Sequence, residues 1–95
     1  MLAIRWAPLA RADIERMLRS HALHDTEAGI DIQDRILASA RFLAAVPAAG
    51  PVSVRGDRRK WRVAGTKYIL FYRITGDHIR ILRVLHGAQD STGVA

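Results

Sequence analysis

Two runs of strongly β-forming residues lie on either side of the pair Gly76-Asp77. Valine, isoleucine, tyrosine and phenylalanine pack well on a pleated sheet, and a two-residue connection containing glycine suits the turns that match strand twist. The pattern predicts a β-hairpin at the heart of a sheet. Alternation places Tyr68, Leu70, Tyr72, Ile74, Ile79, Ile81, Arg83 and Leu85 on one face, and Ile69, Phe71, Arg73, Arg80, Leu82, Val84 and His86 on the other. Both sets are largely apolar, so we expect helices to cover one face and a partner chain to help cover the other.

The residues before the hairpin predict a short strand and two helices. Residues 2–6 alternate well enough for a strand, and Pro8 suits the first turn of a helix, where its missing N–H costs nothing. Two apolar stripes then repeat at helical spacing, Ala10, Ile14, Met17 and Leu18 in the first helix and Ile32, Ile36, Ala40 and Leu43 in the second. We expect the first helix to end within residues 21–24, Asp25 and Thr26 to cap the second, and Pro47 to stop it.

The segment after Gly50 completes the predicted sheet. Residues 52–55 suit a weak strand and residues 59–64 a firmer one, followed by a turn at Gly65-Thr66. The order is β-α-α-β-β-β, which predicts an α+β domain with a helical hairpin packed on one face of an antiparallel sheet. We expect one domain over residues 1–90 and a frayed tail over residues 91–95.

Composition narrows the chemistry that such a domain can perform. The 95 residues include no cysteine, which excludes disulfides and thiolate-zinc sites. No apolar run approaches the roughly 18 residues that a membrane span requires. We therefore expect a soluble, cytoplasmic protein that contacts no membrane.

The net charge of +6 is concentrated in the sheet half of the chain. Residues 1–50 hold six basic and six acidic side chains, whereas residues 51–95 hold nine basic and three acidic ones. An arginine-rich half indicates an acidic partner, either nucleic acid or an acidic protein segment. Solubility alone is the simpler explanation of the same charge.

Several arginines are candidates for contact with such a partner. A basic cluster comprises Arg55, Arg58, Arg59, Lys60 and Arg62. It could reach a phosphodiester backbone, and it could equally protect an edge strand from aggregation. Arg73 and Arg80 are expected opposite each other, where they either receive a partner's carboxylate or splay into water. Arg83 lies in an apolar run and needs a carboxylate such as Glu15, or a helix C-terminal carbonyl.

The histidines and the missing motifs limit the catalytic possibilities. His21 and His24 have a spacing that could bind a metal, but no third ligand is apparent, so we predict no metal site. We find no glycine-rich phosphate loop and no paired carboxylates, and we expect no cofactor. The enzymatic route left open is acid–base cleavage of RNA, in which Lys60, Arg83 and His86 could serve as cations and proton carriers.

Three segments resemble a known family. IRWAPLARADIERM at residues 4–17, GTKYILFYRI at 65–74 and IRILRVLHGAQD at 79–90 are similar to the ParE branch of the RelE/ParE toxins. These are the toxic halves of bacterial type II toxin–antitoxin pairs. The resemblance implies the β-α-α-β-β-β fold and a cognate antitoxin, ParD-like or of another class, whose acidic amphipathic C-terminal segment covers the toxin. Such an antitoxin should be encoded next to this gene.

The two branches of the family imply different targets. RelE-like members cut messenger RNA on the ribosome, while ParE-like members with an assigned target act on DNA gyrase. Nuclease members commonly carry an arginine directly after the tyrosine that matches Tyr68, and here that residue is Ile69, although His86 falls where some nucleases keep a histidine or arginine. We therefore favour a non-nucleolytic gyrase inhibitor over a ribonuclease. The residues expected to bind antitoxin or target are Ile69, Phe71, Arg73, Arg80 and Leu82.

A third reading is a plain nucleic-acid binder. It predicts affinity for naked DNA or RNA that falls steeply with salt. We do not expect the toxin alone to bind nucleic acid directly.

Overall fold

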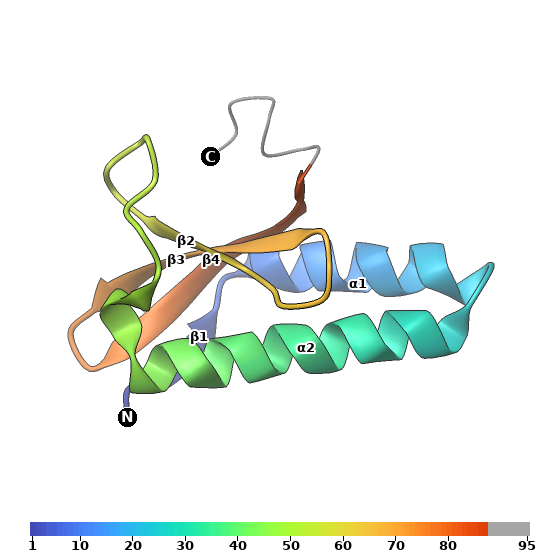
Figure 1. Cartoon of the computed structure of the whole chain (residues 1–95), viewed down its shortest axis with the longest axis horizontal. Helices are drawn as coiled ribbons and strands as arrows, with labels where there is room; N and C mark the ends of the chain where they lie inside the picture. Colours follow the sequence, from blue (N-terminus) through green and yellow to red (C-terminus); the bar gives the residue numbers. More distant parts are fainter. Residues whose placement is uncertain (88–95) are drawn as a thin grey trace.

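A computed structural model describes residues 1–87, so the predicted tail at residues 91–95 and the last residues of the predicted domain lie outside the described range. Its elements are β1 (Ala3–Trp6), α1 (Pro8–Ala22), α2 (Thr26–Ala45), a short 3₁₀ helix η1 (Pro47–Ala49), β2 (Arg59–Arg62), β3 (Tyr68–Thr75) and β4 (His78–His86). The two long helices form a hairpin and lie on one side of the sheet (Figure 1). The predicted β-α-α-β-β-β order is confirmed.

Local sequence signals set the ends of both helices. Pro8 occupies the first turn of α1, which ends at Ala22, inside the predicted range. Asp25 caps α2, and its carboxylate accepts a hydrogen bond from the Ala28 N–H at 3.1 Å. This bond satisfies one of the helix N–H groups that lack a partner within the helix. α2 ends at Ala45, two residues before Pro47, so these predictions are confirmed.

The strands form one sheet in the order β1-β4-β3-β2. β3 pairs antiparallel with both β2 and β4, whereas β1 pairs parallel with β4. The predicted fold class is confirmed, with the difference that the sheet is mixed. Parallel strands need a long crossover connection, and the two helices between β1 and the later strands supply it.

The main core lies between the helices and the inner face of the sheet. Its largest fully buried side chains include Ile36 and Leu43 from α2 and Leu70, Tyr72 and Ile81 from the sheet. These are the positions that the helical and strand periodicities predict. Burial of each such side chain contributes about 1.5–3 kcal/mol.

Tyr72 also anchors the connection that follows α2. Its hydroxyl donates to the Pro47 carbonyl oxygen at 2.6 Å and accepts from the Gly50 N–H at 3.0 Å. A Cβ atom at Gly50 would lie 2.7 Å from both the Lys60 carbonyl oxygen and the Tyr72 hydroxyl oxygen. Only glycine fits there, so the start of the loop that precedes β2 is fixed against the sheet.

A β-bulge interrupts the central hairpin. Phe71 pairs with Arg83, but the next residue, Tyr72, pairs with Ile81, which leaves Leu82 as an extra residue in β4. An extra residue in one strand shifts every later side chain to the opposite face relative to a regular ladder.

The bulge overturns the predicted faces of the residues after it. The predictions were wrong for Arg83, Val84, Leu85 and His86. Val84 packs in the main core, while Leu85 joins Ile69 and Phe71 in a second, smaller cluster on the other face. Ile69 and Phe71 are only 8% and 1% exposed in the single chain. The single chain therefore covers these two side chains itself, and the expectation that a partner chain helps to cover the rest of this face stays a prediction.

The turns and the edge strand depart modestly from prediction. Gly76 has φ of +53°, as the predicted hairpin turn requires. The weak strand predicted at residues 52–55 is absent, because Val52 forms only an isolated bridge to Arg59. The next strand ends at Arg62 instead of Ala64.

Candidate functional site

A row of three arginines crosses the face of the sheet that is turned away from the helices. Arg80 on β4 pairs with Arg73 on β3, as predicted, and with Arg5 on β1. Residues directly opposite each other project from the same face, and neighbouring strands lie about 4.8 Å apart. Within residues 1–87, none of the three forms a salt bridge or a side-chain hydrogen bond. Sequence reasoning missed Arg5, because periodicity does not reveal which edge β1 joins.

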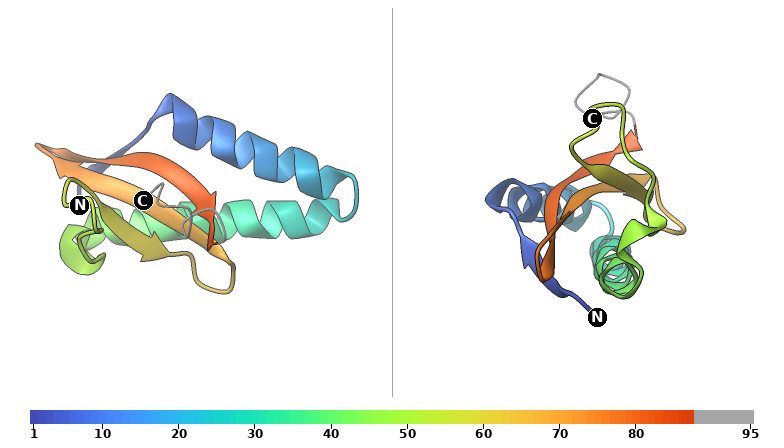
Figure 2. Two further views of the ribbon diagram at one scale, coloured as in Figure 1. Left: turned by 90° about the horizontal axis from the view of Figure 1, so that it is seen from above. Right: turned by 90° about the vertical axis from the view of Figure 1, so that its left-hand side faces the viewer.

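A groove of about 490 Å³ lies beside this row. It is lined by Ala7, Pro8, Leu9, Arg55, Arg58, Arg73, Arg80, Leu82 and Arg83. The loop between η1 and β2, which carries Arg55 and Arg58, rises on the side of the sheet opposite the helices (Figure 2). The groove therefore combines five guanidinium groups with an apolar strip, and it unites Arg73, Arg80 and Leu82 of the predicted contact set.

Few carboxylates balance the groove. Asp57 lies 3.6 Å from Arg55 and 3.2 Å from Arg58, so two arginines share one acid. The hydrogen bond from Arg58 lowers the pKa of the Asp57 carboxyl below its usual range. Because Arg73 and Arg80 have no acidic partner among the described residues, the groove keeps a net positive charge.

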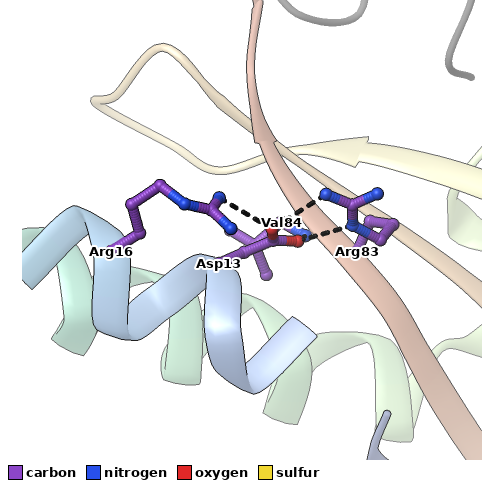
Figure 3. Close-up of polar contacts among 4 residues, drawn as sticks. All are labelled: Asp13, Arg16, Arg83 and Val84. Carbon is purple, nitrogen blue, oxygen red and sulfur yellow. Dashed lines mark hydrogen bonds and ion pairs between the residues drawn. The ribbon is translucent and has the colours of Figure 1, made fainter. Parts of the chain in front are cut away.

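Arg83 is held at the end of the groove by a buried carboxylate of α1 (Figure 3). Its Nε and Nη2 donate to Asp13 Oδ2 and Oδ1 at 2.8 and 2.9 Å. The Val84 N–H also donates to Asp13 Oδ2 at 2.9 Å, and Arg16 adds a contact of 3.2 Å. The prediction that Arg83 meets a carboxylate is confirmed, but the partner is Asp13 and not Glu15.

Beyond Ile81, β4 no longer pairs with β1, and the Asp13 carboxylate accepts the hydrogen bond of the Val84 backbone N–H instead. β1 runs beside β4 only as far as Ile81, and α1 continues along the same edge. The Asp13 side chain is 2% exposed. Burial raises the pKa of the Asp13 carboxyl, but hydrogen bonds from Arg83 and Val84, together with the Arg83 charge, outweigh it and hold the pKa below its usual value. The hydrogen bond to Asp13 in turn raises the pKa of Arg83.

The predicted basic cluster is not a single site. Arg59 donates to the Gly50 carbonyl oxygen at 2.8 Å and so fastens the connection after α2. Arg62 donates to the Thr66 carbonyl oxygen at 3.4 Å, across the turn that follows β2. Arg55 and Arg58 of the cluster line the groove, whereas Lys60, Arg59 and Arg62 do not.

The three residues considered for RNA cleavage do not converge. Lys60 and Arg83 both lie level with Phe71 in the sheet, one strand to either side, and share its face. His86 pairs with Tyr68 and projects from the helix-covered face, where the two rings meet edge to face at 5.5 Å. Since Arg83 is also paired with Asp13, the geometry does not assemble a base, an acid and a free cation.

His21, the histidine of α1, is held by the helix itself. His21 Nδ1 lies 3.0 Å from the Met17 carbonyl oxygen, which can only accept, so this nitrogen carries the proton. Among residues 1–87 no three His, Cys, Asp or Glu side chains are grouped as metal ligands. In the same range, no helix has the length and apolar character to cross a membrane.

A second surface, which sequence reasoning missed, lies between α2 and β2. Phe42 is 44% exposed and stacks on Trp61 with ring centroids 5.3 Å apart. With Arg35, Ala38, Ser39 and Ala64, these rings line a hollow of about 350 Å³. Phe42 lies outside the predicted apolar stripe of α2. An aromatic side chain at such a position was the signal in the sequence that could have predicted this surface.

Comparison with known proteins identifies the class to which this architecture belongs. A solved structure described as the chromosomal ParDE TA system from P. aeruginosa matches with a TM-score of 0.79 and 22% identity, covering 90% of this chain and 96% of that chain. The two chains therefore share one fold, that of the ParE-like proteins. No curated protein sequence matches.

A family model specifies the assignment. The model described as the ParE toxin of the type II toxin-antitoxin system, parDE, matches residues 4–91. Since the match spans nearly the whole chain, the protein belongs to the ParE toxin family. The resemblance predicted from the three sequence segments is confirmed.

Proposed function

We propose that this ParE-family toxin inhibits DNA gyrase and is neutralised by a cognate antitoxin whose acidic, amphipathic C-terminal segment occupies the arginine-lined groove. The observation that carries the proposal is the composition of the groove. Five arginines and an apolar strip meet there, and the described acidic residues leave Arg73 and Arg80 unpaired.

The chemistry of the groove fits an acidic amphipathic segment. Guanidinium groups bind carboxylates through paired N–H donors, and such charged bonds are stronger than neutral ones. Leu9 is 60% exposed and Leu82 is half-buried, so apolar side chains of the partner would gain by covering them. Ile69 and Phe71 are buried and do not line the groove, so they fall outside the proposed contact.

We favour gyrase over the ribosome as the target because the residues that RNA cleavage would need are not brought together. RNA cleavage needs several cations and a proton carrier converging on one phosphate. Lys60, Arg83 and His86 are divided between two faces, and Arg83 is bound to Asp13. Ile69, where nuclease relatives commonly carry an arginine, is buried and apolar. A non-nucleolytic toxin is the function that these positions support.

The test is gyrase supercoiling of relaxed plasmid with purified toxin, with and without the antitoxin from the adjacent gene. We expect inhibition, accumulation of linear DNA from trapped cleavage complexes, and relief by the antitoxin. Normal supercoiling at a large excess of toxin, together with cleavage of messenger RNA on ribosomes, would replace this proposal with the ribonuclease function.

The groove is tested separately through antitoxin binding. Leu82→Glu places a negative charge in the apolar strip and is expected to weaken binding at least tenfold by calorimetry. Leu23→Glu, at an 81% exposed position beyond the end of α1, is the matched control and should bind normally. Equal affinities for the two variants would exclude the groove as the antitoxin site.

A further inference from the structure

The row Arg5, Arg80 and Arg73 differs in character from the groove beside it. In the adjoining row toward the hairpin turn, the same face carries Ala3, His78 and Thr75, none of which is a large apolar residue. The apolar strip of Leu9 and Leu82 lies on the groove side. On this face the two rows therefore offer charge and hydrogen-bond donors, while the exposed side chains of Val52 and Ile74 border Arg73 at one end.

Among residues 1–87, little offsets the repulsion within this row. Like charges placed directly opposite each other on neighbouring strands destabilise a sheet, and here the repulsion occurs twice, at Arg5 with Arg80 and at Arg80 with Arg73. Asp77 in the turn hydrogen-bonds to His78 at 3.2 Å and attracts Arg5 only at longer range, which offsets one end of the row. A ligand that carries several negative charges would remove the repulsion.

We propose that Arg5, Arg80 and Arg73 bind consecutive phosphates of a DNA backbone. A phosphodiester backbone presents charge at regular intervals and has no apolar side chains, which fits this row better than it fits an amphipathic peptide. Arginine forks bind phosphate oxygens in pairs. The inference rests on the proposed function in one respect, which is that the toxin works on a topoisomerase whose substrate is DNA.

The arrangement also provides a means of neutralisation. Arg73 and Arg80 belong both to the row and to the lining of the groove. An acidic segment that fills the groove therefore takes two of the three arginines from the DNA. Antitoxin and DNA compete for the toxin through shared guanidinium groups.

The test uses binding of the purified toxin to a fluorescent DNA duplex, followed by anisotropy over a range of salt concentrations. The variant Arg5→Gln/Arg73→Gln/Arg80→Gln removes the row. The control Arg11→Gln/Arg19→Gln/Arg41→Gln removes the same charge from exposed positions on α1 and α2 that have no described partner. Thermal unfolding of both variants confirms that they remain folded.

Each neutralised phosphate contributes about 0.9 to the slope of log affinity against log salt, so loss of the row should lower that slope by about 2 to 3. The control should change it by less than about 1. Equal losses in both variants would overturn the proposal, because the binding would then be diffuse. An unchanged slope with loss of antitoxin binding would also overturn it and would make the row a peptide site.

The proposal and the gyrase function can fail independently. The DNA assay contains no gyrase, so a row-dependent slope would stand even where supercoiling is unaffected. In the opposite case, a row variant whose DNA-binding slope is unchanged and which still inhibits gyrase fully would overturn DNA contact by the row while leaving the gyrase function intact.

Discussion

The two faces of the sheet differ in what their side chains contact. The inner face packs against α1 and α2, and its central side chains Leu70, Tyr72 and Ile81 are fully buried. On the outer face only a small cluster around Phe71 is buried. Around it lie arginines, and few carboxylates among the described residues pair with them. The first face is explained by folding alone, whereas the charge on the second is not.

This difference separates stability from function. Burial of apolar area on the inner face provides most of the driving force for folding. On the outer face, opposed arginines reduce stability, so their presence points to a ligand. Substitutions on the two faces should consequently move stability and binding in different directions.

The largest expected effect compares adjacent residues of β3 that point to opposite faces. Leu70→Ala should reduce the free energy of unfolding by about 4 kcal/mol, because it empties space in the main core. Ile69→Ala, in the smaller cluster, should cost about 2 kcal/mol, since its surroundings can relax. Urea denaturation measures both. Equal costs would show that the outer cluster is as much a core as the inner one.

Loss of the buried carboxylate should follow closely. Asp13→Ala leaves Arg83 and the Val84 N–H without their acceptor and should cost about 3 kcal/mol. The matched control is Asp31→Ala, which removes an exposed helical pair with Arg35 and should cost about 0.3 kcal/mol. Similar costs for the two variants would contradict a structural role for Asp13.

The same carboxylate should make stability depend on pH. Because the pKa of Asp13 is lower in the folded state, its contribution is complete above the unfolded-state pKa of about 3.9 and is lost as pH falls through the folded-state pKa. The stability advantage of the wild-type protein over Asp13→Asn should therefore shrink below about pH 4. Denaturation curves at several pH values measure it, and a constant difference would exclude the assignment.

The smallest expected effect has the opposite sign. Arg80→Gln removes both repulsions in the arginine row and should raise the free energy of unfolding by about 0.5 kcal/mol. Binding of DNA and antitoxin should weaken at the same time. Arg11→Gln, on the exposed side of α1, should leave stability and binding near wild type. A destabilised Arg80→Gln would mean that Arg80 serves the fold.

Much of the fold follows from local sequence. Asp25 and Pro47 bound α2 as expected, because caps and helix breakers act within one turn of the chain. The Gly76-Asp77 turn fixes the hairpin and therefore the pairing of Arg73 with Arg80. That pairing was the part of the candidate site that sequence could give.

The remaining parts depended on contacts between distant residues. The bulge at Leu82 exchanged the faces of the following side chains, and nothing in the alternation of β4 marks it. Burial of Ile69 and Phe71 likewise depended on how the outer face packs. Sequence reasoning named Glu15 as an example of the acid that holds Arg83, and the actual acid, Asp13, followed only from the position of α1 beside β4.

The sequence by itself determined the order of elements, the helix ends, the central hairpin and the excess of positive charge in the second half. These depend on periodicity, caps, turns and composition, which are local properties. Tertiary structure alone decided that β1 pairs parallel with β4, which brings Arg5 into line with Arg80 and Arg73. It also decided that Asp13 meets Arg83 across 70 residues. Both outcomes depend on which distant surfaces pack together, and local pattern does not encode that choice.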